Sequence, residues 1–263
     1  MTDVADIPSS RLPKVRKLDV ERPWAWLRAG WHDFLAAPGP CLAYGFILAL
    51  AGMILTAAIW FLEVFYLVLP LAAGFMLLGP ILAGGLYEIA RCLEKGEAVE
   101  FSNVLSAWRR NPAQIGLMGL ALMLFLLAWI RIATLIFAIF FSDNPPRPER
   151  EFIIDVFLSV ESLPFLVTGT IVGGILAILV FALSAISIPM LLDKPVNVFA
   201  AIATSMNAVR ENFWPMALWA WLIVFFTAGG IVIGYVGLIV TLPLIGLATW
   251  HAYRDLVDWD SGS

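Results

Sequence analysis

The chain has 263 residues, of which 61% are hydrophobic and only 14% are charged, and its formal net charge is −4. Soluble domains are about half apolar and about one quarter charged, so this composition excludes an ordinary soluble domain and is typical of a membrane protein. The small net charge gives no support for a nucleic-acid partner, and we expect membrane lipids to be the main surroundings of the chain.

The N-terminal region divides into two parts. Residues 1–21 are polar and contain prolines, which predicts a disordered tail. In residues 22–37 apolar side chains recur every three to four positions with charged residues between them, which predicts an amphipathic helix in the membrane interface with tryptophans at headgroup depth. The apolar positions of that helix are Trp24, Leu27, Trp31, Phe34 and Leu35.

Six apolar runs follow in three pairs. Each is long enough, or nearly so, to cross the hydrocarbon core, which needs about 20 residues of helix. We therefore predict an all-α membrane protein whose six transmembrane helices form one domain over 22–256, with a short cytoplasmic tail over 257–263. The runs are residues 41–62, 66–87, 115–141, 164–189, 215–233 and 235–253.

The pairs look like internal repeats. Amphipathic stretches at 100–112 and 196–215 precede the second and third pairs, so we predict three hairpin repeats, each preceded by an interfacial helix. Pro80, Pro189 and Pro243 lie near the same end of the second helix of each pair, where proline kinks a helix. Transporters contain repeats with broken helices, but duplication without transport gives the same pattern. We favour duplication, because these helices lack the polar lining of a midplane site.

Basic residues gather in the N-terminal tail and in the segments that follow the second and fourth runs. By the positive-inside rule, both termini lie in the cytoplasm, and we expect the protein in the bacterial inner membrane. The segment 142–163 is then the one sizeable outer loop. Its proline-rich, acidic sequence is typical of a solvated loop, and the alternative is a docking surface for a partner.

Arg131 lies within the third run. An arginine in the membrane core costs at least about 2.5 kcal/mol, so it usually pairs, faces protein or marks a pathway. Since Phe141 ends the run ten residues later, the side chain could also extend to the outer headgroups. A structural role and a functional role both stay open. Candidate acidic partners are Glu63, Asp143, Asp155 and Glu161.

Glu88 and His251 each lie eight residues beyond a kink proline, and Arg91 and Arg254 follow them. One interpretation is a charged ring that gates the inner mouth of the bundle. The other, which we favour, is ordinary anchoring at the headgroups beside neighbouring tyrosines and tryptophans. The glycine pairs Gly84–Gly85 and Gly173–Gly174 favour close packing of helices.

Metal and cofactor chemistry has little support in the sequence. Membrane haem commonly needs histidine ligands deep in the bundle, and His32 and His251 are the two histidines of the chain. Cys41 and Cys92 fall short of a closed zinc or iron–sulfur site. The chain has no HExxH, GxSxG or Walker A motif. We expect no cofactor, no metal and no enzymatic activity.

Three stretches carry a family resemblance: WHDF with AAPGP before the first run, GPILAGGLYEIARCLEKGE, and SIPMLLDKPVNVFAAIATSMNAVRENFWPM. Together they resemble the DUF2189 family of predicted bacterial integral membrane proteins, over about residues 22–256. The family is functionally uncharacterised, so the resemblance implies no catalytic residues. Some relatives are labelled as cytochrome oxidase subunit I, which leaves open an accessory association with a respiratory complex. The histidine count argues against the oxidase function itself.

These observations lead to two hypotheses about function. The first is an accessory, scaffold or assembly component of a membrane complex, a respiratory complex included, which packs against other membrane subunits or a second copy of itself. The alternative is a small-molecule or lipid transporter that uses the kinked helices and Arg131. A continuous polar cavity reaching Arg131 would favour the transporter, and a dry, fully packed bundle would exclude it.

Overall fold

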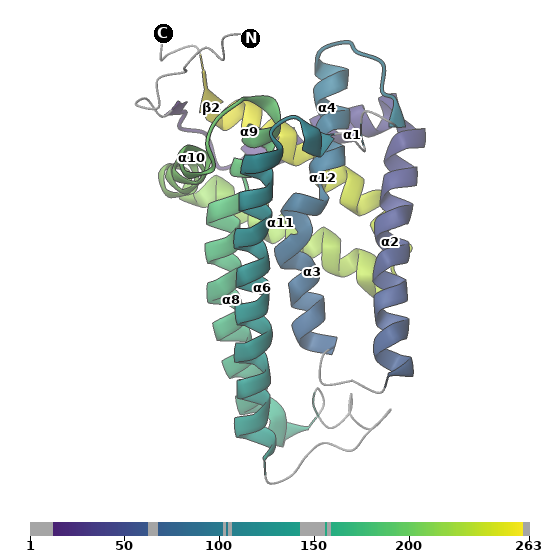
Figure 1. Ribbon diagram of the computed structural model, residues 1–263, viewed down its shortest axis with the longest axis vertical. Coiled ribbons are helices and arrows are strands. Elements are labelled where there is room, and N and C mark those ends of the chain that lie inside the picture. Colours follow the sequence, from purple (N-terminus) through teal and green to yellow (C-terminus); the bar gives the residue numbers. More distant parts are fainter. Residues whose placement is uncertain are drawn as a thin grey trace.

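The computed structural model describes residues 13–62, 68–101, 104, 107–142, 156 and 159–259. This part of the chain is helical apart from one short pair of antiparallel strands (Figure 1). The α-helices are α1 (Arg22–Ala36), α2 (Pro38–Phe61), α3 (Val68–Leu82), α4 (Gly84–Glu94), α6 (Pro112–Phe141), α8 (Leu163–Ser184), α9 (Ser187–Asp193), α10 (Val198–Glu211), α11 (Phe213–Val232) and α12 (Leu238–Leu256). The short elements are η2 (Ala107–Arg109), η3 (Val160–Ser162), β1 (Lys14–Val15) and β2 (Val257–Asp258).

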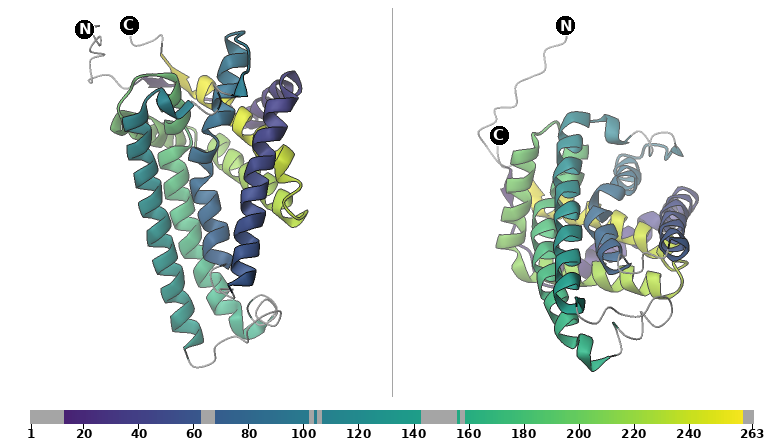
Figure 2. Two further views of the ribbon diagram at one scale, coloured as in Figure 1. Left: turned by 45° about the vertical axis from the view of Figure 1, so that its right-hand side comes forward. Right: turned by 60° about the horizontal axis from the view of Figure 1, so that its bottom comes forward.

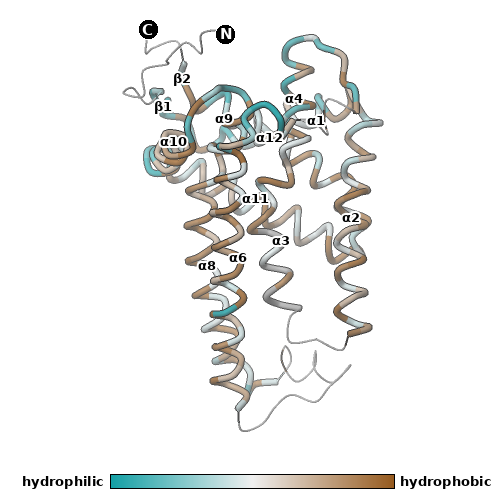
Figure 3. Tube along the Cα trace, in the orientation of Figure 1, coloured by the Kyte–Doolittle hydropathy of each residue, from teal (hydrophilic) through white to brown (hydrophobic). Residues whose placement is uncertain are grey.

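The helices take two directions. Helices α2, α3, α6 and α8 run along the long axis, whereas α11 and α12 cross obliquely between them (Figures 1 and 2). We call the end of the bundle with β1 and β2 the strand end, and the opposite end, where α2 and α6 finish, the far end. The long helices are mostly hydrophobic, and the hydrophilic segments gather at the strand end (Figure 3).

The six predicted runs are mostly helical where the structure describes them, with turns at Ala83, at 185–186 and at 233–237. By length and composition, four helices could cross a membrane: α2, α6, α11 and the joined α8–α9 segment, Val160–Asp193. Helix α3 is described over 15 residues only, and α12 ends in a polar turn. The four spans agree with the prediction, whereas an arrangement of six spans in three like hairpins is not confirmed.

The third pair differs from the others because α12 is the central helix of the strand end. It packs against α1, α2, α4 and α11, and its last turns contain the fully buried Trp250 and Tyr253. A helix enclosed by protein in this way does not face lipid over its last turns.

The predicted interfacial helices are present in part. Helix α1 packs on α12, but the buried side includes Trp26, while Trp24 and Trp31 are 50% and 44% exposed. The predicted apolar stripe is therefore divided between the protein interior and the surroundings. Helix α10 precedes α11 as expected. Over 100–112 the structure describes Glu100, Phe101, Val104 and the segment from η2 onward.

The terminal segments are partly structured, unlike the predicted tails. Residues Lys14 and Val15 pair with β2. The backbone N–H of Leu18 donates to Asn212 Oδ1 at 2.8 Å, and Asn212 Nδ2 donates to the Arg16 carbonyl at 2.9 Å. The predicted disordered tail over 1–21 is therefore wrong for residues 13–21, which lie against the helices. Residues 1–12, and most of the loop 142–163, lie outside the described residues.

Candidate functional site

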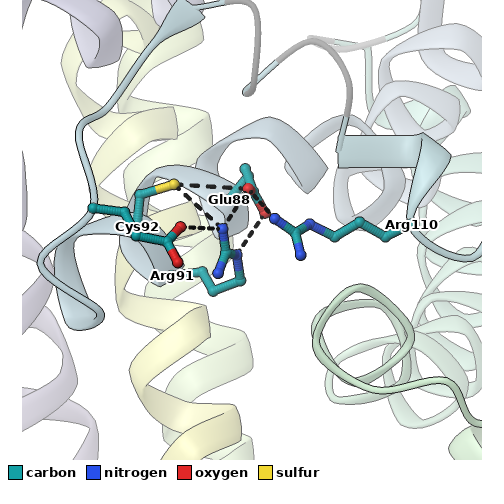
Figure 4. A network of polar contacts seen from close by, with 5 residues as sticks. Glu88, Arg91, Cys92 and Arg110 are labelled. Atoms are coloured by element: carbon teal, nitrogen blue, oxygen red, sulfur yellow. Dashed lines mark hydrogen bonds and ion pairs between the residues drawn. The ribbon is translucent and has the colours of Figure 1, made fainter.

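A buried ionic network lies at the strand end (Figure 4). Glu88 and Arg91 are only 2% and 3% exposed. Arg91 Nε and Nη2 donate to the two Glu88 carboxylate oxygens, each at 2.9 Å, and Arg91 Nη2 also donates to Glu97 at 2.7 Å. Arg110 Nη2 reaches the same Glu88 carboxylate at 2.7 Å. The network fastens the segment after α4 to that helix.

The charges in this network stabilise one another. Burial of the Glu88 carboxyl favours its neutral form, but hydrogen bonds and charges from Arg91 and Arg110 outweigh burial, so its pKa lies below the ordinary value. The hydrogen bond to Glu88 raises the pKa of Arg91. The pKa of the neighbouring Cys92 thiol is raised, chiefly by burial. A buried pair of this kind is costly to break from one side.

Two further contacts involve the predicted residues of α12. Arg254 Nε and Trp250 Nε1 each donate to Glu94, both at 2.9 Å. His251 Nε2 lies 2.7 Å from an Asp33 carboxylate oxygen. The structure thus pairs Glu88 with Arg91 within α4, and it joins Arg254 of α12 to Glu94 of α4 and His251 of α12 to Asp33 of α1.

The aromatic neighbours of these residues are interior side chains. Tyr87, Trp250 and Tyr253 are at most 2% exposed, so they pack inside the protein rather than against lipid headgroups. The acidic partners Asp33 and Glu94 were not singled out in the sequence. Their spacing in the chain gave no signal, because each pairs with a residue more than 150 positions away.

Arg131 stands apart from these contacts. It is exposed on α6, and no hydrogen bond or ion pair joins it to the described residues. Three of its candidate partners, Glu63, Asp143 and Asp155, lie outside the described residues. The structural and functional interpretations of Arg131 both remain predictions.

Two helices are interrupted, and a hydroxyl group from another helix bridges each break. Between α3 and α4, Tyr44 Oη donates to the Leu82 carbonyl at 2.7 Å and accepts from the Gly85 N–H at 3.3 Å. Between α8 and α9, Ser205 Oγ donates to the Ala182 carbonyl at 2.8 Å and accepts from the Ile186 N–H at 3.2 Å. Each hydroxyl therefore satisfies backbone groups that a continuous helix would pair internally.

The three prolines do not act alike. The break before α9 falls at Ala185, four residues before Pro189, where a proline ring collides with the helix backbone. The break after α3 comes three residues beyond Pro80, next to Gly84 and Gly85. Helix α12 continues through Pro243 without interruption. A break common to all three prolines is thus not observed, and the predicted kinks stay a prediction.

An apolar pocket of about 800 Å³ lies beside these breaks. Its walls come from α3, α6 and α8 on one side and from the oblique α11 and α12 on the other. Leu82 and Ala83 at one break, and Ser184 and Ala185 at the other, line it. Arg131 does not line it, so the polar cavity that the transporter hypothesis required is not this pocket.

The pocket reaches the outer surface of the protein between α8 and α11. Ile178, Trp221 and Val224 line it, and they are 68%, 56% and 47% exposed. Side chains that border both the pocket and the surroundings mark an opening to the side. A molecule could enter there from the lipid phase without passing through water.

One polar group at the pocket wall has no partner. Trp219 lines the pocket and is fully buried, and its Nε1 has no hydrogen-bond acceptor among the described residues. A buried N–H without a partner costs about 1–3 kcal/mol, so such a group calls for an explanation. The sequence places Trp219 within an apolar run and gives no sign that its indole N–H lacks an acceptor.

The helices and the pocket define an integral membrane protein, built from long apolar helices with a polar cluster at one end. Comparison with protein families agrees with this class: residues 68–193 match the family described as predicted integral membrane protein (DUF2189). The match bears out the family resemblance noted in the sequence over residues 68–193, the stretch from α3 to α9. No curated protein and no solved structure matches the chain.

Proposed function

We propose that this protein is a non-catalytic membrane protein that holds an apolar molecule taken from the bilayer. The observation that carries the proposal is the pocket of about 800 Å³, which is lined by apolar side chains and opens sideways between α8 and α11. Sites for small molecules commonly measure about 300–1,000 Å³ and have mostly apolar walls. The two hydroxyl-bridged helix breaks support the proposal, because interrupted helices often border binding sites in membrane proteins.

The proposal keeps one part of the transporter hypothesis and leaves out another. Residues at the helix breaks line the pocket, whereas Arg131 does not. Binding and retention of a lipid, rather than passage of a polar solute, therefore fit the pocket better. For orientation, we propose that the strand end faces the cytoplasm of a bacterial inner membrane, following the positive-inside rule. The basic residues at that end include Arg16, Arg22, Arg91, Arg110 and Arg254.

The test is co-purification of lipid. The full chain is extracted in a mild detergent and examined by native mass spectrometry, beside a variant in which Gly174→Leu fills the pocket. We expect the wild-type chain to retain a lipid-sized adduct that survives collisional activation, and the variant to lose most of it. Equal adducts on both proteins would show that bound lipid lies elsewhere and would contradict the proposal.

A second candidate is the accessory or scaffold function expected from the sequence. Helix α6 supports it with a row of exposed leucines spaced three and four residues apart, the spacing of helix–helix seams. They are Leu117, Leu120, Leu124 and Leu127, each at least 48% exposed. Cross-linking through cysteines placed in this row should give one discrete product if the row contacts another subunit or a second copy, and none if it faces lipid.

A further inference from the structure

The shape of the pocket identifies the kind of molecule that fits it, if the proposed function holds. We infer that the occupant is one extended acyl chain of a phospholipid, with its ester end toward the strand end and its methyl end toward the far end. The second chain of the same lipid would stay in the bilayer beside the lateral opening. Four observations lead to this inference.

The first observation is length. Phe165 near the start of α8 and Ala185 just beyond its end both line the pocket. They lie twenty residues apart, which is about 30 Å along an α-helix. This distance is close to the thickness of the hydrocarbon core, roughly 30 Å. The pocket thus follows nearly the whole of α8, as an acyl chain lying along a helix would require.

The second observation is width. A volume of about 800 Å³ spread over a length of about 30 Å is a long and narrow space rather than a round cavity. An extended hydrocarbon chain is slender, roughly 5 Å across when its carbons contact their neighbours at about 4 Å. The proportions of the groove therefore suit a chain lying along α8 better than a compact, many-ringed molecule lying across it.

The third observation concerns glycines that packing does not require. Gly79, Gly169 and Gly174 line the pocket, and a Cβ added at any of them would meet no atom within 4 Å. Glycine inside a helix is less favourable than alanine by about 0.5–1 kcal/mol. Since no neighbouring helix needs the space, these glycines leave room along the groove itself.

The fourth observation is the difference in polarity between the two ends. At the far end the pocket is bordered by Ile136, Phe137 and Phe165, which offer no polar side-chain atom. At the other end it is bordered by Ser184, Thr249 and Trp219, which carry polar atoms. The two hydroxyls donate to carbonyls of their own helices, and the enclosed indole N–H of Trp219 has no partner among the described residues. A phospholipid chain carries its polar ester at one end only, and the more polar end of the pocket sets the direction of the chain.

The test is photo-cross-linking in vesicles that contain the full-length protein and a phospholipid with a diazirine in one acyl chain. One probe carries the diazirine next to the ester, and the other carries it at the methyl end. Cross-linked peptides are located by mass spectrometry. We expect the first probe to label peptides containing Ser184 or Thr249, and the second to label peptides containing Phe137 or Phe165.

Two variants provide the controls. Gly174→Leu should reduce labelling of these peptides at least ten-fold, because its side chain enters the groove. Gly116→Leu is the matched control: Gly116 is also a helical glycine with open space around it, but it lies outside the pocket lining, so labelling should not change. Trp219→Phe removes the N–H and keeps a ring, and it should lower labelling by the ester-end probe about five-fold.

The outcomes separate this inference from the proposed function. If both probes label the same pocket peptides, or label them in the reverse order, the pocket binds lipid but the extended, directed chain is wrong. If Trp219→Phe leaves labelling unchanged, the position assigned to the ester is wrong. If Gly174→Leu has no effect on labelling by either probe, the proposed function fails as well.

Discussion

Glycines in two regions of the bundle have opposite surroundings: in one region a neighbouring helix touches the glycine, and in the other the glycine borders open space. Where α2 crosses α12, a Cβ on Gly45 would collide with the backbone carbonyl oxygen of Ile239, so the two helices touch through the glycine. Along the α8 face of the pocket, Gly169 and Gly174 have no atom within 4 Å of that position. The strand end is therefore locked by contact and by buried ion pairs, whereas the α8 face keeps open space. A rigid end that supports an open groove is an arrangement suited to holding a ligand.

The largest effect should come from breaking the ion pairs of the locked region. Glu88→Ala leaves the buried Arg91 without its main partner, and we expect a loss of about 3–5 kcal/mol in the free energy of unfolding. Glu97→Ala is the control, since the Glu97 side chain is 49% exposed and its loss should cost less than about 1 kcal/mol. Thermal unfolding in detergent measures both. Similar values for the two variants would show that the Glu88 network does not lock the strand end.

Alanine at the two kinds of glycine should act in opposite directions. Gly45→Ala forces α2 away from α12, and we expect a cost of about 1–3 kcal/mol. Gly174→Ala removes the helix penalty of glycine without a collision, and we expect a gain of about 0.5–1 kcal/mol. The melting temperatures of the Gly45→Ala and Gly174→Ala proteins, compared with that of the wild type, measure both effects. A destabilised Gly174→Ala protein would mean that the groove is packed rather than open.

The hydroxyl bridge between α3 and α4 should contribute at an intermediate level. Tyr44→Phe leaves the Leu82 carbonyl and the Gly85 N–H without their side-chain partner, and we expect a cost of about 1–3 kcal/mol. Tyr235→Phe is a suitable comparison, because its hydroxyl bonds the exposed Thr56 and its loss should cost less than about 1 kcal/mol. Faster hydrogen exchange at Gly85 in the first variant alone would locate the effect at the helix break.

The smallest effect should appear as a dependence on pH. The pKa values of Glu88 and Asp255 are lowered in the folded protein: burial opposes the charge, but hydrogen bonds from Arg91 to Glu88, and from Arg22 and Trp26 to Asp255, outweigh it. Their stabilisation is complete above the ordinary values of 4.5 and 3.8 and is lost as the pH falls through the lowered values. The melting temperature should stay level from neutral pH down to about pH 5 and decline at more acid pH. A decline that begins near neutrality would point to other groups.

The sequence predicted the helices well and their arrangement poorly. Apolar length is a local property, so the runs that became α2, α6, α8 and α11 could be recognised directly. Tyr44 and Ser205 are distant in the sequence from the helix breaks that they bridge, and no local sequence pattern predicts such bridges.

The same limit applies to the candidate site. Gly173 and Gly174 were interpreted as close-packing residues, and that holds for Gly173, which lies against Trp129, but not for Gly174. The two neighbours differ in which side of α8 they occupy, because Gly173 faces Trp129 of α6 and Gly174 does not. Charged residues at helix ends were recognisable, whereas their partners were not, because pairs such as Arg254 and Glu94 come from different helices.

An electron density map of the protein in lipid nanodiscs tests the central claim most directly. We predict continuous, elongated density along α8 from Phe165 to Ala185. The density should be wider near Trp219, where the ester end of the lipid is placed. Density of this form should be absent from a map of the Gly174→Leu protein obtained in the same way. A wild-type map in which α11 closes against α8 and the side chains fill the space would contradict the account.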